Sequence, residues 1–116
     1  MPIEMRSSQA LKLLHDFEFA LVHDAEADLS ARQLAVLLTV YLEQPPHTVR
    51  GLAAKLKVTK PVITRALDSM GRIDLLTRRR DPADRRNVVV QRTVKGALYV
   101  EKLGDTLAEK AKGLPR

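Results

Sequence analysis

The sequence predicts a mainly α-helical fold that carries one small β-hairpin. Apolar residues recur at helical spacing along most of the chain, and residues 50–70 hold two short amphipathic helical patterns joined by a tight connection. Directly afterwards, residues 78–87 (RRRDPADRRN) place five arginines around a turn signal that lies between two strand-like runs. A helix-turn-helix followed by a charged hairpin predicts a winged helix-turn-helix, here with further helices on either side.

The length of 116 residues is enough for one domain with one modest core. We therefore expect a single domain over residues 1–116, with a core at 30–93 and flanking helices at about 5–23 and 94–112. Because 45% of the residues are hydrophobic but only 3% are aromatic, the core must consist mainly of Leu, Val, Ala and Ile.

The first two helices differ in how their apolar residues are spread. Over about residues 5–23 they occupy more than one face, which predicts packing on two sides. The second helix begins at a capping box, because Ser30 can act as N-cap and Gln33 stands three residues later. Pro45 and Pro46 end it. Its expected buried stripe follows steps of three and four residues: Leu34, Leu37, Leu38 and Tyr41.

The helix-turn-helix itself follows from residue 48. Thr48 or Val49 begins a short helix, and Thr59 can cap the next one. Pro61 suits the first turn of that second helix, because no intrahelical donor is needed there. The inward-facing residues are expected to be Leu52, Ala53 and Leu56 on the short helix and Ile63, Ala66, Leu67 and Met70 on the longer one.

The hairpin and the last helix complete the pattern. Residues 75–79 and 87–92 are predicted to be the strands of the wing, joined at Asp81-Pro82, a pair that favours a turn. Thr93 caps a final helix that reaches about Lys112. Its apolar stripe can pack against a second copy of the chain, or fold back on the first helix: Val100, Leu103, Leu107, Ala111 and Leu114.

Charge is distributed unevenly over the chain, whose net charge is +6. Residues 1–30 hold six acids and two bases, a balance of −4, whereas residues 47–95 hold thirteen bases and four acids, a balance of +9. The middle section therefore attracts a polyanion such as nucleic acid. Charge alone does not decide this, because ribosomal and membrane-surface proteins are also basic.

Other classes of function have little support in the sequence. There is no cysteine, no Ser-His-Asp order, no Gly-rich phosphate loop and no recognisable pair of carboxylates, so we expect neither an enzyme nor a cofactor. The histidines His15, His23 and His47 have no acid or His at a ligand spacing, so no metal site is expected. Without a signal peptide or an apolar run of roughly 20 residues, a cytoplasmic protein is expected.

The order of these elements, together with Asp81-Pro82-x-Asp84-Arg85-Arg86 and Thr93-x-x-Gly96, resembles the MarR family of bacterial winged helix-turn-helix regulators over about residues 30–100. The most specific part is TKPVITRAL at residues 59–67, followed at the right separation by DPADRR at 81–86. The resemblance implies a homodimer that binds palindromic operator DNA, usually as a repressor. It also implies a possible small-molecule effector, commonly anionic or phenolic, that releases the DNA.

The resemblance also implies roles for individual residues. Lys60, Pro61, Thr64 and Arg65 fall on recognition-helix positions that face the major groove, while Arg86 matches the wing-tip arginine of the minor groove and Asp84 the carboxylate that orients it. Chemistry agrees with these roles, because an arginine such as Arg65 can form two hydrogen bonds to guanine. Further DNA contacts, mostly to phosphates, are expected from Thr59, Arg78, Arg79, Arg80 and Arg85.

The sequence departs from the family pattern in three places. Asp74 stands where the family usually has a glycine in a left-handed turn, and Arg92 stands where it commonly has a buried leucine. Either the stem of Arg92 snorkels, or the base of the wing meets another partner. The chain also leaves no room for a further C-terminal helix, so dimerisation is expected to rely on the first and last helices.

Alternative interpretations stay open at this point. The wing arginines could form a solvated face paired with Asp81 and Asp84, and Arg65 could pair with Asp68 or Asp24 instead of a base. The whole fold could also be a protein-interaction module whose basic face docks an acidic partner protein.

Overall fold

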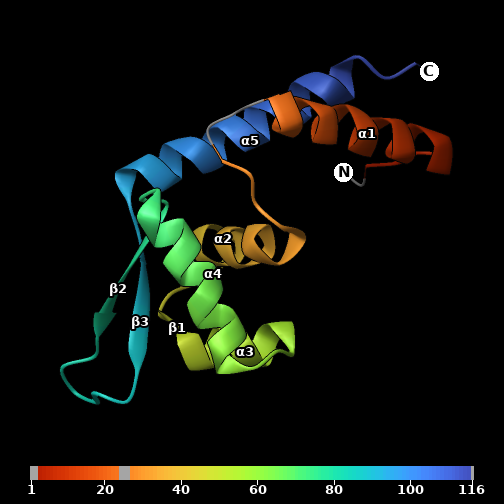
Figure 1. Ribbon diagram of the computed structural model, residues 1–116. Helices are drawn as coiled ribbons and strands as arrows, with labels where there is room; N and C mark the ends of the chain where they lie inside the picture. The colour runs from red at the N-terminus through yellow and green to blue at the C-terminus, as the bar shows by residue number, and fades with distance from the viewer. Residues whose placement is uncertain (1–2, 24–26, 116) are drawn as a thin grey trace. The chain divides into compact units, whose positions relative to one another are not determined.

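The computed structural model describes residues 3–23 and 27–115 and confirms a mainly helical fold with a small β-sheet. The elements, drawn in Figure 1, are α1 (Ser7–His23), α2 (Ala31–Leu42), β1 (His47–Thr48), α3 (Val49–Leu56), α4 (Lys60–Arg72), β2 (Leu76–Arg80), β3 (Val88–Arg92) and α5 (Val94–Lys112). The chain divides into two compact units, which we call the winged unit (residues 29–100) and the terminal unit (residues 1–28 with 101–116, as far as they are described).

Short-range hydrogen bonds set the helix boundaries of the winged unit. The capping box of α2 is confirmed: the Ser30 hydroxyl accepts from the Gln33 amide at 3.1 Å, and the Gln33 side chain accepts from the Ser30 amide at 2.8 Å. Helix α2 ends at Leu42, ahead of the two prolines. The N-cap of α3 is Thr48, whose hydroxyl accepts from the Gly51 amide at 2.9 Å.

The core of the winged unit is built from α2, α3, α4 and the base of the wing. All four residues predicted for the buried face of α4 are buried, and Leu52 and Ala53 of α3 are buried beside Leu56, which is half-buried. The predicted stripe of α2 is partly wrong. Val36, Leu37 and Val40 are fully buried, whereas the remaining predicted residues Leu34, Leu38 and Tyr41 are half-buried. The helix is turned by about one residue because it contacts both α4 and β3.

The sheet has three antiparallel strands in the order β1-β3-β2. The two wing strands occupy 76–80 and 88–92, each starting one residue later than predicted, and β1 was not predicted because two residues are too few to show an alternating pattern. In Figure 1, the β2–β3 hairpin lies beside α4 and ends in a long loop. Since side chains alternate along a strand, Leu76, Arg78 and Arg80 share one face and Thr77 and Arg79 the other.

Tyr41 joins three segments at the base of the wing. Its hydroxyl accepts from the Thr93 amide at 3.0 Å and can donate to the Leu75 carbonyl at 2.8 Å or to the Thr93 carbonyl at 3.2 Å. Gly96 makes room for this hydroxyl, because a Cβ there would lie 1.8 Å from it and 2.2 Å from the Leu75 carbonyl oxygen. The first turn of α5 is thus fixed to α2 and to the start of the wing.

The corner between α4 and β2 has the expected left-handed residue. Asp74 has φ 59°, a conformation for which glycine is usually better suited. Its carbonyl accepts a hydrogen bond from the Thr93 hydroxyl at 2.7 Å, and the same hydroxyl accepts from the Gly96 amide at 2.8 Å. The Thr93-x-x-Gly96 motif therefore caps α5 and holds the corner at once.

Arg92 has a specific partner at the end of α2. Its Nε donates to the Val40 carbonyl at 2.8 Å and its Nη2 donates to the Glu43 carbonyl at 3.2 Å, while the guanidinium carbon lies 5.8 Å from the centre of the Tyr41 ring. Carbonyls at a helix C-terminus lack intrahelical donors, and a cation is favourable there. The arginine that replaces the usual leucine is thus a cap for α2.

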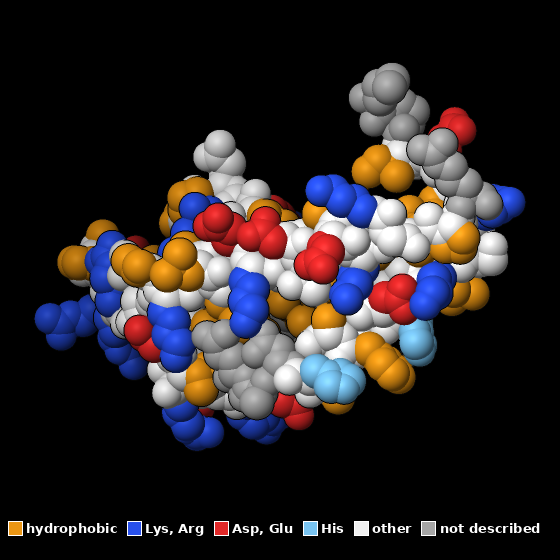
Figure 2. Space-filling view, turned by 90° about the horizontal axis from the view of Figure 1, so that it is seen from above, with side chains coloured by type: hydrophobic (Ala, Val, Ile, Leu, Met, Phe, Trp, Pro, Cys, Tyr) orange, Lys and Arg blue, Asp and Glu red, His pale blue; other side chains and the backbone are white. Residues whose placement is uncertain are grey.

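The terminal unit is packed on one side only. Helix α1 has no fully buried residue. Leu13, Phe17, Ala20 and Leu21 are half-buried, while other apolar side chains are open to solvent at exposed fractions of 64% for Leu11, 55% for Leu14, 57% for Phe19 and 79% for Val22. Figure 2 shows hydrophobic side chains at the surface between charged ones. Of the two packing sides predicted for α1, one is therefore open in the single chain.

Across the described residues, no helix combines the length and the apolar character that crossing a membrane requires.

Candidate nucleic-acid interface

A groove in the winged unit brings together α3, the start of α4 and the wing. Its volume is about 350 Å³. The groove is lined by Val49, Arg50, Lys60, Thr64, Arg78, Arg80, Arg86, Asn87 and Val88. Five of these residues are basic and none is acidic. We call this feature the basic groove, because its lining presents a concentrated positive charge to any anion that enters it.

The N-terminal end of α4 contributes hydrogen-bond donors to the same side. Thr59 is the N-cap, and its side chain makes no capping hydrogen bond and has no other partner among the described residues, so its hydroxyl can bind a ligand. Lys60 and the exposed Pro61 occupy the first two helical positions. A helix N-terminus carries unpaired amides and a partial positive charge, which together favour a phosphate.

Thr64 and Arg65, one turn later, are both exposed, as residues that contact base edges must be. Arg65 does not line the basic groove, and its side chain has no hydrogen bond or ion pair with a described residue. The alternative pairing of Arg65 with Asp68 is wrong, because Asp68 accepts from Arg78 instead. Asp24, the other proposed partner, lies outside the described residues.

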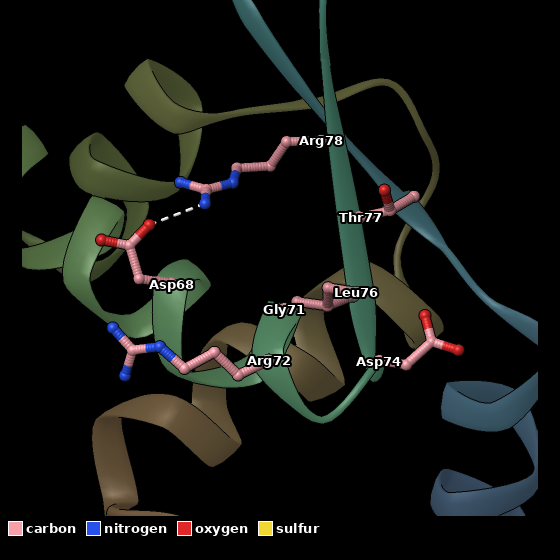
Figure 3. Close-up of a pocket in the computed structure, with 7 residues that line it drawn as sticks. All are labelled: Asp68, Gly71, Arg72, Asp74, Leu76, Thr77 and Arg78. Atoms are coloured by element: carbon pink, nitrogen blue, oxygen red, sulfur yellow. Dashed lines mark hydrogen bonds and ion pairs between the residues drawn. The ribbon is translucent and has the colours of Figure 1, made fainter.

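The ion pair between Arg78 and Asp68 connects the wing to the recognition helix. Nη2 of Arg78 donates to the Asp68 carboxylate at 2.6 Å, across the upper end of a second pocket of about 510 Å³. Figure 3 shows Arg78 reaching from β2 toward Asp68 on α4, with Arg72 and Asp74 near the corner below. The pair spans ten residues of sequence, so it restrains the angle between α4 and β2.

At the wing tip, Asp84 holds Arg86 in place. The carboxylate accepts from the Arg86 backbone amide at 3.1 Å, from its Nε at 3.2 Å and from its Nη2 at 3.4 Å. The Arg86 side-chain hydrogen bond is the main reason that the pKa of Asp84 is lowered, followed by the backbone hydrogen bond and the charge of Arg50. The Arg86 side chain is nevertheless 84% exposed, so its guanidinium is oriented and accessible.

The remaining wing residues differ in their surroundings. Asp81 accepts from the Ala83 amide at 2.9 Å, which forms the turn, and Arg80 donates to the Arg85 carbonyl at 2.8 Å. The side chains of Arg79 and Arg85 have no partner among the described residues. Arg86 thus pairs with Asp84, as the solvated-face alternative predicts. The ion pairs of the described residues include none between Asp81 and a wing arginine, so a general pairing of these arginines with Asp81 and Asp84 is not observed.

Of the predicted DNA-contacting residues, the structure brings Lys60, Thr64, Arg78, Arg80 and Arg86 into one groove. Thr59 is the exposed N-cap of α4, and Pro61 and Arg65 are exposed on that helix. Asp84 is hydrogen-bonded to Arg86, Arg85 lies on the loop, and Arg79 lies on the opposite face of the wing. Sequence reasoning missed Arg50 and Asn87. The only available signal for Arg50 was its place in the first turn of α3, on the solvent side.

Comparisons with known proteins agree with this architecture. A family model described as "MarR family" matches residues 29–88. No curated protein sequence matches the chain. Among solved structures, a mutant form of S. aureus MepR is 22% identical with a TM-score of 0.75, covering 95% of this chain and 82% of that one.

Two further solved structures give similar values. The transcriptional repressor CouR, bound to a 23-mer DNA duplex, is 24% identical with a TM-score of 0.72, covering 91% of this chain and 72% of that one. The transcriptional regulator Tm0710 from Thermotoga maritima is 24% identical with a TM-score of 0.67, covering 91% and 69%. At such identities the likeness establishes the winged fold.

Proposed function

Because the chain belongs to the MarR family, we propose that it is a sequence-specific regulator of transcription that binds double-stranded DNA, acting as a repressor at a palindromic operator. The observation that carries this proposal is the basic groove, in which α3, α4 and the wing together present five basic side chains and no acidic one. Such a regulator acts by occupying DNA and catalyses no reaction. It works in the bacterial cytoplasm, where the chromosome lies.

The recognition helix α4 enters the major groove by its N-terminal end. The free hydroxyl of Thr59 and the ammonium group of Lys60 bind phosphates, which set the position of the helix on the duplex. Pro61 and Thr64 contact the major groove of the DNA. Arg65, exposed and without a partner among the described residues, forms the bidentate contact to guanine that discriminates between sequences.

The wing supplies a second point of contact. Arg86, held by Asp84, enters the minor groove, where a narrow A·T-rich segment has the most negative potential. Arg78, Arg80 and Arg85 contact flanking phosphates. The hydrogen bond between Arg78 and Asp68 keeps this wing at a fixed angle to α4, so that both elements reach the same duplex.

A second copy of the chain completes the DNA-binding unit. The open apolar side of α1, together with residues of α5 such as Leu107, which is 40% exposed, buries itself against the same elements of a partner. Residues 5–23 and 94–112 thus act as dimerisation helices. A two-fold dimer presents two α4 helices to half-sites about 34 Å apart, one turn of the double helix.

Binding to fragments of the source genome tests this function directly. Fluorescence anisotropy should give an affinity that falls steeply with salt and differs strongly between fragments. Arg65→Ala should relax specificity at one base position by about 1–3 kcal/mol. Arg86→Ala should weaken binding mainly where the flanks are A·T-rich. Arg32→Ala provides the control, because Arg32 is an exposed arginine of α2 outside the basic groove.

Equal affinity for all duplexes would count against sequence-specific regulation. Absence of any salt-dependent binding, combined with capture of an acidic protein that survives nuclease treatment, would instead favour the interaction module. Both measurements use the protein without substitutions, so neither result can be attributed to a variant that fails to fold.

A further inference from the structure

Arg78 is the cation of the basic groove that a carboxylate of the recognition helix binds. Its Nη2 donates to Asp68 at 2.6 Å. Arg80, on the same face of β2, donates instead to the backbone carbonyl of Arg85 at 2.8 Å, and a carbonyl carries no net charge. The charge of Arg78 is therefore balanced by a neighbour, whereas Arg80 keeps its full positive charge in the groove.

Asp68 lies on the side of α4 that the proposed function turns toward DNA. It follows Thr64 by four residues, so the two side chains share one face of the helix. The side chains of Asp68 and Arg78 are 43% and 33% exposed, so both remain accessible to a ligand. Figure 3 shows the Arg78 guanidinium reaching Asp68 by one of its nitrogen atoms, and its other N–H donors have no partner among the described residues.

An ion pair acts on DNA differently from a free cation. A free cation attracts any duplex, because its charge acts at a distance and displaces counterions wherever the protein docks. An ion pair carries no net charge, so its attraction for a distant polyanion is weak. Its spare N–H donors act only through hydrogen bonds, which need a donor–acceptor distance of about 2.7–3.2 Å and good alignment. Arg78 therefore gains a phosphate contact only when α4 and the wing are both correctly seated.

We propose that Asp68 is a positioning residue that confines the contribution of Arg78 to the correctly docked complex. It thereby lowers the affinity of the protein for DNA of random sequence and raises its preference for the operator. This inference rests on the proposed function, since it concerns the same interface. It gives a role to an acidic side chain that would otherwise only repel the duplex.

Asp68→Asn in the full chain tests this role, because it removes the charge and makes Arg78 a free cation. In fluorescence anisotropy at low salt, affinity for a duplex of random sequence should rise about threefold or more, and the slope of log K against log salt should steepen by about 0.9. Affinity for the genomic fragment that the unmodified protein binds most tightly should not rise, because the freed guanidinium loses its orientation. An unchanged affinity for random DNA, or an unchanged ratio of the two affinities, would overturn the proposal.

Two matched variants separate the ion pair from simple changes of charge. Asp74 lines the same second pocket, and its side chain has no partner among the described residues. Asp74→Asn should therefore leave the salt slope and the ratio of affinities unchanged. Arg80→Gln removes a cation that is not balanced, so it should weaken binding to random and selected DNA by similar factors, whereas Arg78→Gln should weaken binding to selected DNA more. Equal effects within either pair of matched substitutions would overturn the proposal.

Asp68→Glu separates the charge from the fold. It keeps a carboxylate within reach of Arg78, so affinity for random DNA should stay as low as in the unmodified protein. A rise equal to that of Asp68→Asn would overturn the proposal, and a gain of affinity cannot come from a folding defect. An unmodified protein that binds all duplexes equally would overturn the proposed function and this inference together. A protein that discriminates, with an Asp68→Asn variant that discriminates equally well, would overturn this inference alone.

Discussion

Helix α5 belongs to both units of the chain, and its two glycines have opposite surroundings. Gly96, in the winged unit, lies so close to Tyr41 and Leu75 that a Cβ would come within 1.8 and 2.2 Å of their oxygens. Gly104, in the terminal unit, has nothing within 4 Å of the same position. The winged unit is therefore closely packed around Gly96 by its own residues, whereas the terminal unit has open space beside Gly104.

The buried side chains show the same contrast. Ile63 and Met70 of α4 are fully buried within one chain, while no residue of α1 is. Packing within one chain thus fixes the arrangement of α4 and the wing. The proposed dimer would then set the spacing between two such units.

Truncation of a core residue should give the largest effect. Ile63→Ala should lower the free energy of unfolding by about 2–5 kcal/mol, because it leaves a cavity in a fully packed interior. Leu14→Ala, at a position 55% exposed in the single chain, should change unfolding of the dissociated protein by less than about 0.5 kcal/mol. Urea denaturation at low protein concentration measures both.

The same Leu14→Ala variant tests the role of the terminal unit. It should raise the dimer dissociation constant about tenfold or more, since a leucine buried at the partner contributes about 1.5–3 kcal/mol. Sedimentation equilibrium provides the measurement. An unchanged dissociation constant would show that this side of α1 is not the dimer contact.

Substitution of the two glycines of α5 should give effects of opposite sign. Gly96→Ala should destabilise the protein by about 1–3 kcal/mol, because the Tyr41 ring or the wing corner must move. Gly104→Ala should stabilise it by up to about 1 kcal/mol, because alanine favours the helix and meets nothing. Thermal unfolding of the two variants side by side is sufficient, and a loss of stability in both would remove the contrast between the units.

Relief of backbone strain in the winged unit should have a smaller, stabilising effect. Asp74 and Lys57 have φ of 59° and 57°. A side chain with a Cβ has a steric cost of about 1–2 kcal/mol in this conformation, less for Asp, and glycine avoids that cost. Asp74→Gly should therefore raise stability by up to about 1 kcal/mol, and it retains the carbonyl that accepts from Thr93. A decrease in the urea midpoint would mean that the Asp74 side chain contributes a contact of its own.

The wing tip should show the smallest effect on stability, because it is the exposed part of the winged unit. The pKa of Asp84 lies below the ordinary value of 3.8, chiefly because the charged carboxylate accepts from Arg86. Its contribution is therefore present above the ordinary pKa and is lost as pH falls through the lowered one. Carboxyl NMR titration should place the midpoint of the Asp84 titration below pH 3.8. Asp84→Asn should broaden the Arg86 side-chain signals at neutral pH.

Local signals predicted much of this fold. The capping box at Ser30, the four inward residues of α4 and the end of α5 at Lys112 each follow from neighbours in sequence, and all are confirmed. The Asp81-Pro82 turn is likewise local. The pairing of Asp84 with Arg86 was instead implied by the family resemblance.

What the sequence left undetermined depends on distant partners. The rotation of α2 follows from its contacts with α4 and β3, and the partner of Arg92 lies 52 residues away at Val40. β1 exists only because His47 and Thr48 pair with Val90 and Val89. Arg78, Arg79 and Arg80 look alike in sequence, and their positions along β2 assign them to different faces.

That register makes the length of β2 as important as its composition. Leu76 is anchored in the core, so removal of the single codon for Thr77 would turn Arg79 toward the basic groove and rotate Arg78 and Arg80 away from it. The total charge of the protein would be unchanged. An in-frame deletion at an uncharged position should thus weaken DNA binding as much as loss of the arginines themselves. In the wing, a one-residue shift of the strand would affect binding more than the substitution of any single residue.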